Sequence, residues 1–171
     1  ETQESFFQKF NLPVANLYGL SETGPSHFDD PQNQDWRPGS IGKPLLVNEC
    51  KIFKDDMSFA DVDEIGQIAL KGDNVFSGYY RNNSATEKAM HNGYFLTGDI
   101  GYFDSDGYYY FANRSKDLII KGGVNIFPGE IEEIIMQLRE VNLAAIVGYA
   151  DNILGQEIMA FVKLNDDSRI D

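Results

Sequence analysis

The chain has 171 residues, of which 42% are hydrophobic and 13% aromatic, enough to bury a core in one domain or a little more. Its formal net charge of −13 at pH 7 repels nucleic acid and anionic membrane surfaces, which leaves small molecules as the expected partners. It has one cysteine, no apolar run of membrane-spanning length and no signal-peptide pattern at its start. These features predict a cytoplasmic protein without an internal disulfide or a transmembrane segment.

The first residues predict a helix, then a buried strand and a polar turn. Residues 1–10 carry three phenylalanines on one helical face, and Pro13 is expected to end that helix. Residues 14–18 are a short strand candidate that leads into the GLSETG turn at 19–24. A strand that stops at glycine with hydroxyl and carboxylate groups beyond it can face a phosphate and its metal ion, but such turns are also common in ordinary loops.

The next segment predicts a surface loop followed by two alternating strands. Residues 27–37 are polar and rich in turn formers, and neither His27 nor His91 has a second ligand candidate nearby, so no metal role follows. Residues 49–53 and 65–71 alternate as strands, which suits a small barrel-like subdomain.

A short helix is expected next, where Ser84 and Glu87 form a capping box and Gly93 ends the helix. Asp99 then follows Thr-Gly at the mouth of a strand that is expected to begin at Ile100. A carboxylate held there by rigid backbone suits a pair of vicinal hydroxyls, although an Asp after Thr-Gly is often only a turn former.

The DSDG segment at 104–107 predicts a hairpin turn, with Gly107 at the position that needs a positive φ. Its two arms carry Asp99 and Arg114, so strand pairing would bring a carboxylate and a guanidinium together at the open end. That pair can grip a ribose, or Arg114 can belong to an ordinary solvated cluster. A calcium loop is excluded, because the twelfth position of the pattern holds Ser115 instead of a carboxylate.

The last part of the chain predicts a helix packed on a small sheet. A strand is expected at 117–121, after which Gly122-Gly123 either admits a ligand close to the backbone or makes a plain hairpin turn. Pro128 starts a helix with one apolar face, and strands at 141–147 and 157–164 are joined by a loop at 148–156. The apolar face consists of Ile131, Ile134, Ile135 and Leu138, and Glu130, Glu132 and Glu133 lie near the positive end of the helix dipole.

Four strings of the sequence together resemble the region of adenylate-forming enzymes (the acyl-CoA synthetase, luciferase and nonribosomal-peptide adenylation superfamily) where the large domain joins the small one. In chain order they are YGLSETGP, GSIGKPL, EIGQIALKGDNVFSGYY and GYFLTGDIGYFDSDGYYYFANRSKDLIIKGGVNIFPGEIEE. The resemblance implies an α+β fold, with a partial β-barrel-like subdomain of the large AMP-binding domain over residues 1–113. An incomplete small, mobile α+β domain follows over residues 114–171.

The resemblance also implies roles for single residues. Tyr18 and Gly19 belong to the nucleotide site, with Tyr18 stacking on adenine, while Ser21 bonds phosphate and Glu22 holds Mg²⁺ that bridges the phosphates of ATP. Asp99 and Arg114 hold the ribose and complete the nucleotide ligands. In the small domain, Lys116 is the hinge about which that domain rotates between two half-reactions, and Gly122 and Gly123 form a loop that approaches the pantetheine of coenzyme A.

The implied reaction joins a small carboxylate to ATP, giving an acyl-adenylate and pyrophosphate, and then transfers the acyl group to a thiol. The string IIKGGVNIFPGEIEE is more similar to acyl-CoA synthetases than to peptide-synthetase domains, which favours a fatty-acid or other carboxylate–CoA ligase acting in fatty acid metabolism. The alternatives are an adenylation domain that loads a carrier protein and a non-catalytic adenine-nucleotide-binding domain. The expected ligands are ATP or AMP, Mg²⁺ and coenzyme A; acyl chain length and oligomeric state do not follow from the sequence.

The family also has an upstream phosphate loop and a catalytic lysine near the end of the small domain, and neither is found in this sequence. The chain is therefore expected to be an excised piece that holds part of a nucleotide site and is inactive alone.

Overall fold

The computed structural model describes residues 2–32 and 36–166. The chain divides into two compact units, Glu1–Ala112 and Asn113–Asp171, each of which is described by itself. Within the described residues the fold is mostly β, with three α-helices and one 3₁₀ turn. None of the helices described is long and apolar enough to cross a membrane.

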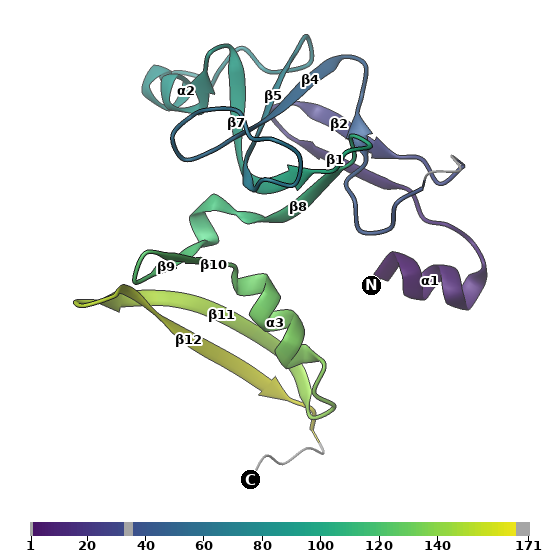
Figure 1. Ribbon diagram of the computed structural model, residues 1–171, viewed down its shortest axis with the longest axis vertical. Coiled ribbons are helices and arrows are strands. Elements are labelled where there is room, and N and C mark those ends of the chain that lie inside the picture. Colours follow the sequence, from purple (N-terminus) through teal and green to yellow (C-terminus); the bar gives the residue numbers. More distant parts are fainter. Residues whose placement is uncertain (1, 33–35, 167–171) are drawn as a thin grey trace. The chain divides into compact units, whose positions relative to one another are not determined.

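The first unit contains two antiparallel sheets (Figure 1). The smaller sheet has the order β1-β2-β3, formed by β1 (Asn16–Leu20), β2 (Gly24–Asp29) and β3 (Lys43–Pro44). The larger sheet has the order β4-β5-β7-β6, and β8 pairs with β7 outside that path. Its strands are β4 (Asn48–Phe53), β5 (Gly66–Gly72), β6 (Met90–His91), β7 (Tyr94–Phe103) and β8 (Tyr109–Arg114).

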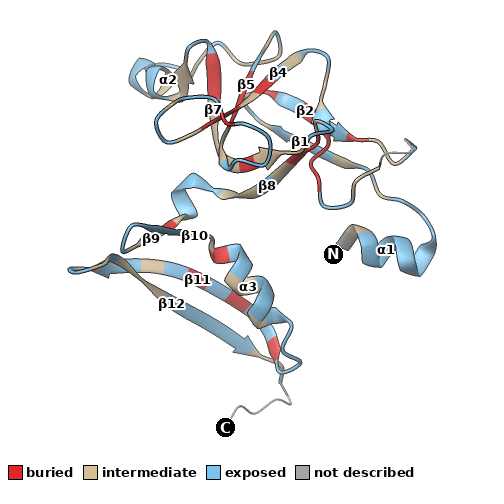
Figure 2. Ribbon diagram, viewed as in Figure 1, coloured by how far each residue is buried: buried red, intermediate tan, exposed pale blue. Residues whose placement is uncertain are grey.

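The core of the first unit is centred on β5, where both faces of the strand are covered (Figure 2). Ile68, Ala69 and Leu70 are each 0% exposed, although they point alternately to opposite sides of the sheet. Ile68 and Leu70 pack with Ile52 from β4, and Ala69 packs in a second cluster on the other side. The strands predicted at 49–53 and 65–71 are confirmed to within a residue. The barrel-like closure stays a prediction.

The helix predicted at the start of the chain is confirmed over its described residues, but three residues expected to bound helices of the first unit, Pro13, Ser84 and Gly93, do not bound them. Helix α1 (Thr2–Phe10) ends before Pro13, because Asn11 turns into the left-handed region at φ 52° while its N–H still bonds Phe7 O at 2.7 Å. Helix α2 (Asn83–Ala89) is capped by Asn82, whose side chain accepts from Ala85 N, and not by the predicted Ser84 box. Strand β6 follows α2 directly, so Gly93 lies in the next turn and does not end the helix.

The second unit is a four-stranded antiparallel sheet of order β10-β9-β12-β11 with one helix. Its elements are a 3₁₀ turn (Ser115–Asp117), β9 (Ile119–Lys121), β10 (Val124–Ile126), α3 (Pro128–Met136), β11 (Val141–Asp151) and β12 (Gly155–Leu164). The strand predicted from residue 117 therefore begins two residues later, after the 3₁₀ turn.

The loop predicted at 148–156 was wrong, because β11 and β12 continue through most of it and pair as far as Asp151 and Gly155. Asp151 closes the short turn that remains, where Oδ1 accepts from the N–H groups of Ile153 and Leu154 at 2.9 and 2.8 Å. The predicted apolar face of α3 is only partly used. Ile134 is 66% exposed, whereas Ile131 is half-buried.

Candidate functional site

Two motif segments far apart in the sequence meet in the first unit. The hydroxyl of Tyr18, on β1, donates to Asp99 Oδ2, on β7, at 2.6 Å across a sequence separation of 81 residues. Asp99 is 1% exposed, and Tyr18 is half-buried. Burial, and then the bond to the carboxylate, raise the pKa of Tyr18 above its ordinary value, so its hydroxyl stays a donor near neutral pH.

The backbone of β7 holds Asp99 at an irregular step of the sheet. The register of β5 against β7 shifts between Gln67 and Ala69, and Gly98 takes φ 76° there. Thr97 Oγ1 donates to Ile68 O at 2.7 Å and accepts from Asp99 N at 3.1 Å. The prediction that a strand begins after Asp99 was wrong, since β7 runs through it, but the carboxylate is held by rigid backbone as expected.

The other predicted site residues of the GLSETG segment, Gly19, Ser21 and Glu22, lie in the hairpin of β1 and β2. The strand does not stop at Gly19 but continues to Leu20, two residues beyond the predicted end. A Cβ on Gly19 would lie 2.2 Å from Gly24 O, so only glycine fits this close pairing. In the turn that follows, Ser21 is exposed and Glu22 is half-buried. β1 alternates half-buried and exposed residues, so it is not the buried strand expected.

Glu22 has a defined partner. Tyr79 donates its hydroxyl to Glu22 Oε1 at 3.0 Å. No group of three or more His, Cys, Asp or Glu side chains in the described part of the chain could hold a metal ion. A single carboxylate beside substrate phosphates is nevertheless a common way for proteins to bind Mg²⁺, which keeps several waters. The donor set at Glu22 therefore fits a cation that arrives with a nucleotide.

The prediction that His27 is a polar surface residue was wrong. His27 lies in β2, opposite Tyr18, and is 0% exposed; its ring centroid is 5.5 Å from that of Tyr18 and 4.9 Å from that of Tyr109. Its Nδ1 lies 3.1 Å from Ser26 Oγ. Burial lowers the pKa of His27 to about 4, so the ring is neutral at pH 7. The error arose because β2 extends to Asp29; the predicted loop also includes residues 33–35, which lie outside the described residues.

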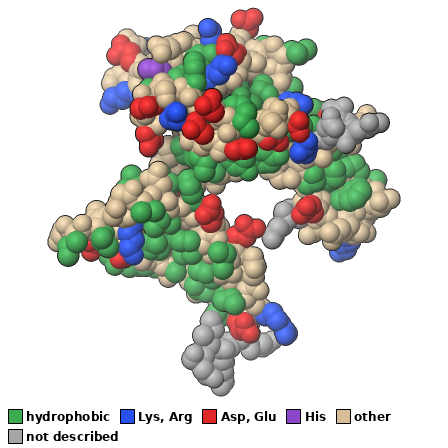
Figure 3. Space-filling model, in the orientation of Figure 1, with side chains coloured by type: hydrophobic (Ala, Val, Ile, Leu, Met, Phe, Trp, Pro, Cys, Tyr) green, Lys and Arg blue, Asp and Glu red, His purple; other side chains and the backbone are tan. Residues whose placement is uncertain are grey.

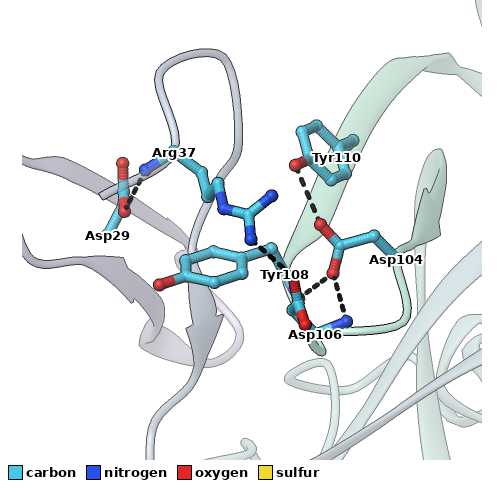
Figure 4. A network of polar contacts seen from close by, with 6 residues as sticks. All are labelled: Asp29, Arg37, Asp104, Asp106, Tyr108 and Tyr110. Atoms are coloured by element: carbon cyan, nitrogen blue, oxygen red, sulfur yellow. Dashed lines mark hydrogen bonds and ion pairs between the residues drawn. The ribbon is translucent and has the colours of Figure 1, made fainter. Parts of the chain in front are cut away.

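The DSDG segment is a hairpin turn, as predicted (Figure 4). Gly107 takes φ 80°, and Asp104 Oδ1 accepts from the N–H groups of Asp106 and Tyr108 at 3.0 and 2.9 Å. Asp104 Oδ2 accepts from the Tyr110 hydroxyl at 3.0 Å. Asp106 pairs with Arg37, whose guanidinium lies over the ring of Tyr108. The carboxylates of the turn are thus used to hold the turn and the neighbouring loop.

The other predicted site residues belong to the second unit. Arg114 ends β8 and is exposed, and its N–H donates to Asn113 Oδ1 at 2.8 Å. Lys116 lies exposed in the 3₁₀ turn. Gly122 and Gly123 form the two-residue turn between β9 and β10, with φ 58° and 82°. The predicted meeting of Asp99 with Arg114 stays a prediction, because the two residues belong to different units.

A pocket of about 390 Å³ lies in the second unit between the 3₁₀ turn, the start of α3 and β11. Lys116, Glu132 and Gln156 are among its polar lining residues. Glu132 Oε1 accepts from Ile146 N on β11 at 2.7 Å, so this glutamate does more than complement the helix dipole. Sequence reasoning missed this bond because it joins a helix to a strand that follows it.

Comparison with known proteins identifies two family models in the chain. The AMP-binding enzyme model matches residues 1–80, and the model for the AMP-binding enzyme C-terminal domain matches residues 130–171. The sulfoacetate–CoA ligase of Cupriavidus necator is 39% identical over 173 residues, which is 100% of this chain and 34% of that protein. The 2-succinylbenzoate–CoA ligase of Geobacillus kaustophilus is 40% identical over 154 residues, 90% of this chain and 31% of that protein.

Solved structures of related proteins superpose on nearly the whole chain. ATP-bound MatB from Rhodopseudomonas palustris superposes with a TM-score of 0.91 at 32% identity, covering 99% of this chain and 34% of that one. The o-succinylbenzoate CoA synthetase (MenE) of Bacillus subtilis, in complex with its acyl-adenylate intermediate, gives 0.86 at 34% identity, covering 96% and 34%. The chain thus spans about a third of the length of these relatives. The matched models, the relatives and the fold agree: the chain belongs to the AMP-binding enzyme family.

Proposed function

We propose that the protein carrying this chain is an AMP-forming carboxylate–CoA ligase, which adenylates a carboxylate with ATP and then forms a thioester with coenzyme A. The observation that carries the proposal is the hydrogen bond between Tyr18 and Asp99. The bond joins residues 18–22 to residues 97–99, and the family resemblance assigns both segments to one nucleotide. The relatives named above as CoA ligases support the same activity.

In the proposed site, the first unit positions the nucleotide. The ring of Tyr18 stacks on adenine beside Gly19, and Asp99 accepts from ribose hydroxyls, with Arg114 as a further ribose ligand. Ser21 presents an exposed hydroxyl to phosphate. Because Asp99 is buried in this structure, a ribose can reach its carboxylate only after a covering side chain or segment moves aside.

Glu22 is the proposed ligand for Mg²⁺, and a MenE structure in complex with ATP and a magnesium ion supports the expectation that a cation accompanies the nucleotide. When bound, the cation neutralises phosphate charge during attack of the carboxylate on the α-phosphate. The protein's own contribution is alignment, since in-line phosphoryl chemistry depends mainly on positioning. No general acid or base among the described residues is needed for this step.

We assign the first unit, Glu1–Ala112, to the end of the large AMP-binding domain, predicted over residues 1–113, and the second unit, Asn113–Asp171, to the start of the small one, predicted over 114–171. Lys116 is the proposed hinge, and its place in an exposed 3₁₀ turn between elements suits a residue that absorbs a backbone change. Gly122 and Gly123, exposed at the tip of the β9-β10 hairpin, are proposed to approach the pantetheine arm.

The substrate is proposed to be a small carboxylate. The relatives above are named for sulfoacetate and 2-succinylbenzoate, so fatty acids are one acyl class among several to test. The two rival functions are loading of a carrier protein and nucleotide binding without catalysis.

The test uses the translation product of the full reading frame that encodes this chain. Pyrophosphate exchange is measured with panels of dicarboxylic, aromatic, sulfonated and fatty acids, and product formation is compared with free coenzyme A and with a phosphopantetheinyl carrier. Acid-dependent exchange and a coenzyme A thioester are expected. Exchange with transfer only to the carrier would favour the first rival, and AMP binding by calorimetry without any exchange would favour the second.

A further inference from the structure

Hydrogen bonds from a separate segment of the first unit, residues 74–79, hold the turn that carries Glu22. Asn74 Nδ2 donates to Thr23 O at 2.7 Å, and Phe76 N donates to Glu22 O at 2.8 Å. The third hydrogen bond runs from the Tyr79 hydroxyl to the side chain of Glu22, at Oε1, over 3.0 Å. Both the backbone and the carboxylate of Glu22 are therefore set by residues more than 50 positions later.

The segment at residues 74–79 is itself fixed by ring contacts and by a hydrogen bond to α2. The ring of Phe76 lies 5.2 Å from that of Phe95, which is 3% exposed, and 4.8 Å from that of Tyr79. The N–H of Tyr79 donates to Thr86 Oγ1, on α2, at 2.9 Å. Tyr79 is thus fixed through its ring and its backbone, so its hydroxyl is delivered to a defined place although the ring is 36% exposed.

A hydroxyl that donates to a carboxylate fixes the carboxylate plane without neutralising its charge. An ionised carboxylate has about four lone-pair sites, so one bond to Tyr79 leaves capacity for a cation. The phenolic O–H of Tyr79 is the donor in this bond, because an ionised carboxylate can only accept. Groups that orient a metal ligand in this way typically change metal affinity by about 10- to 100-fold when removed.

We propose that Tyr79 is a positioning residue for Glu22: its hydroxyl orients the carboxylate toward the Mg²⁺ that accompanies ATP. The inference rests on the proposed function, because it needs Glu22 to meet a metal–nucleotide complex. It adds a residue outside the GLSE turn to the nucleotide site and accounts for the contact between two segments distant in sequence.

The test compares Tyr79→Phe with Tyr80→Phe in the full-length protein. Tyr80 is the matched control, because it is adjacent, 85% exposed, and has its ring against Arg81. Calorimetry measures binding of ATP with Mg²⁺ and of ATP in EDTA. For Tyr79→Phe, Mg·ATP is expected to bind about 10-fold more weakly while metal-free ATP binds as before, and the Mg²⁺ concentration for half-maximal pyrophosphate exchange should rise similarly. In a Glu22→Gln background, Tyr79→Phe should have no further effect.

Two results would overturn the inference while leaving the proposed function intact. In the first, Tyr79→Phe behaves like Tyr80→Phe although the unsubstituted protein binds Mg·ATP more tightly than metal-free ATP. In the second, Tyr79→Phe weakens both forms of ATP equally, which indicates a structural role. If the unsubstituted protein binds no ATP at all, the proposed function itself falls and this inference falls with it.

Discussion

The two units differ in the polar side chains that they bury. In the described residues, every buried polar or charged side chain belongs to the first unit: Thr23, Ser26, His27, Asp29, Ser40 and Asp99. Both units expose large hydrophobic side chains; in the second unit several of these lie on the two long strands, among them Leu143 at 56% and Phe161 at 57%. Figure 3 shows hydrophobic side chains over much of the face of this unit that is in view.

This difference indicates that side-chain positions are fixed more closely in the first unit. Buried polar groups cost free energy unless they are hydrogen-bonded, so a unit that keeps several of them fixes their partners closely. Asp99 illustrates this, because its Oδ2 accepts a hydrogen bond from the hydroxyl of the half-buried Tyr18 at 2.6 Å. The second unit buries no polar or charged side chain among its described residues and so has fewer such constraints; substitutions on its exposed strand faces should affect its stability less.

The largest expected effect is on unfolding free energy, and one side-chain truncation in each unit tests the difference between the units. Ile68→Ala empties a site that is 0% exposed and should cost about 2–5 kcal/mol of unfolding free energy, whereas Phe161→Ala should cost less than about 0.5 kcal/mol. Urea unfolding would be followed by the fluorescence of Trp36, the single tryptophan, and by far-UV circular dichroism. Equal losses for the two variants would refute the contrast.

The next effect concerns pH. The unfolded chain binds a proton at His27 near pH 6.5, whereas the buried ring resists until about pH 4. Stability is therefore full above pH 6.5 and should fall by up to about 3 kcal/mol as pH drops to 4. Urea unfolding of the unsubstituted chain and of His27→Phe, at pH 4 to 8, checks this. The difference between the curves isolates His27, since the carboxylates titrate in both, and parallel curves would contradict the prediction.

A smaller effect is expected for Tyr18→Phe, which keeps the ring and removes the donor to Asp99. A hydrogen bond to a charged group contributes about 1.5–3 kcal/mol, and we expect a loss of that size together with a raised KM for ATP. Tyr109→Phe is the control, because it loses a bond to a neutral acceptor, Cys50 O at 3.0 Å. A smaller stability loss than in the control would contradict the importance of the Tyr18–Asp99 bond.

The smallest expected effect lies in the second unit. Glu132→Ala removes the acceptor of the Ile146 N–H and should cost about 1 kcal/mol. Glu133→Ala, its exposed neighbour on α3, should stay within about 0.5 kcal/mol. The two variants would be compared by thermal unfolding, and an equal shift in Tm would indicate that only the helix dipole matters at these positions.

Local chemistry explains which elements were predictable from the sequence. The turn at Asp104–Gly107 and the strands on either side follow from a glycine with positive φ and from alternating side chains, both of which act over a few residues. His27 was missed because its burial depends on Tyr109, which is far along the chain. The continuation of β11 past Val147 was missed because Gly148 and Asn152 look like loop residues when pairing is ignored.

The candidate site divides in the same way. Family resemblance assigned Tyr18, Glu22 and Asp99 to one nucleotide, yet the bond between Tyr18 and Asp99 required coordinates, because no periodicity links residues 81 positions apart. Tyr79 carries no signal in its own neighbourhood, since Gly-Tyr-Tyr suits an exposed turn as well as a partner for Glu22.

The position of β11 has a practical consequence. Among the strands described, this 11-residue strand is at one end of its sheet, so one row of its backbone amides and carbonyls faces away from β12. Such a rim can template the addition of a strand from another molecule; two of the strand's amides are already bonded elsewhere, Ile146 N to Glu132 and Val141 N to Leu138 O. Samples of this chain alone should therefore self-associate as concentration rises, through intermolecular pairing along that rim.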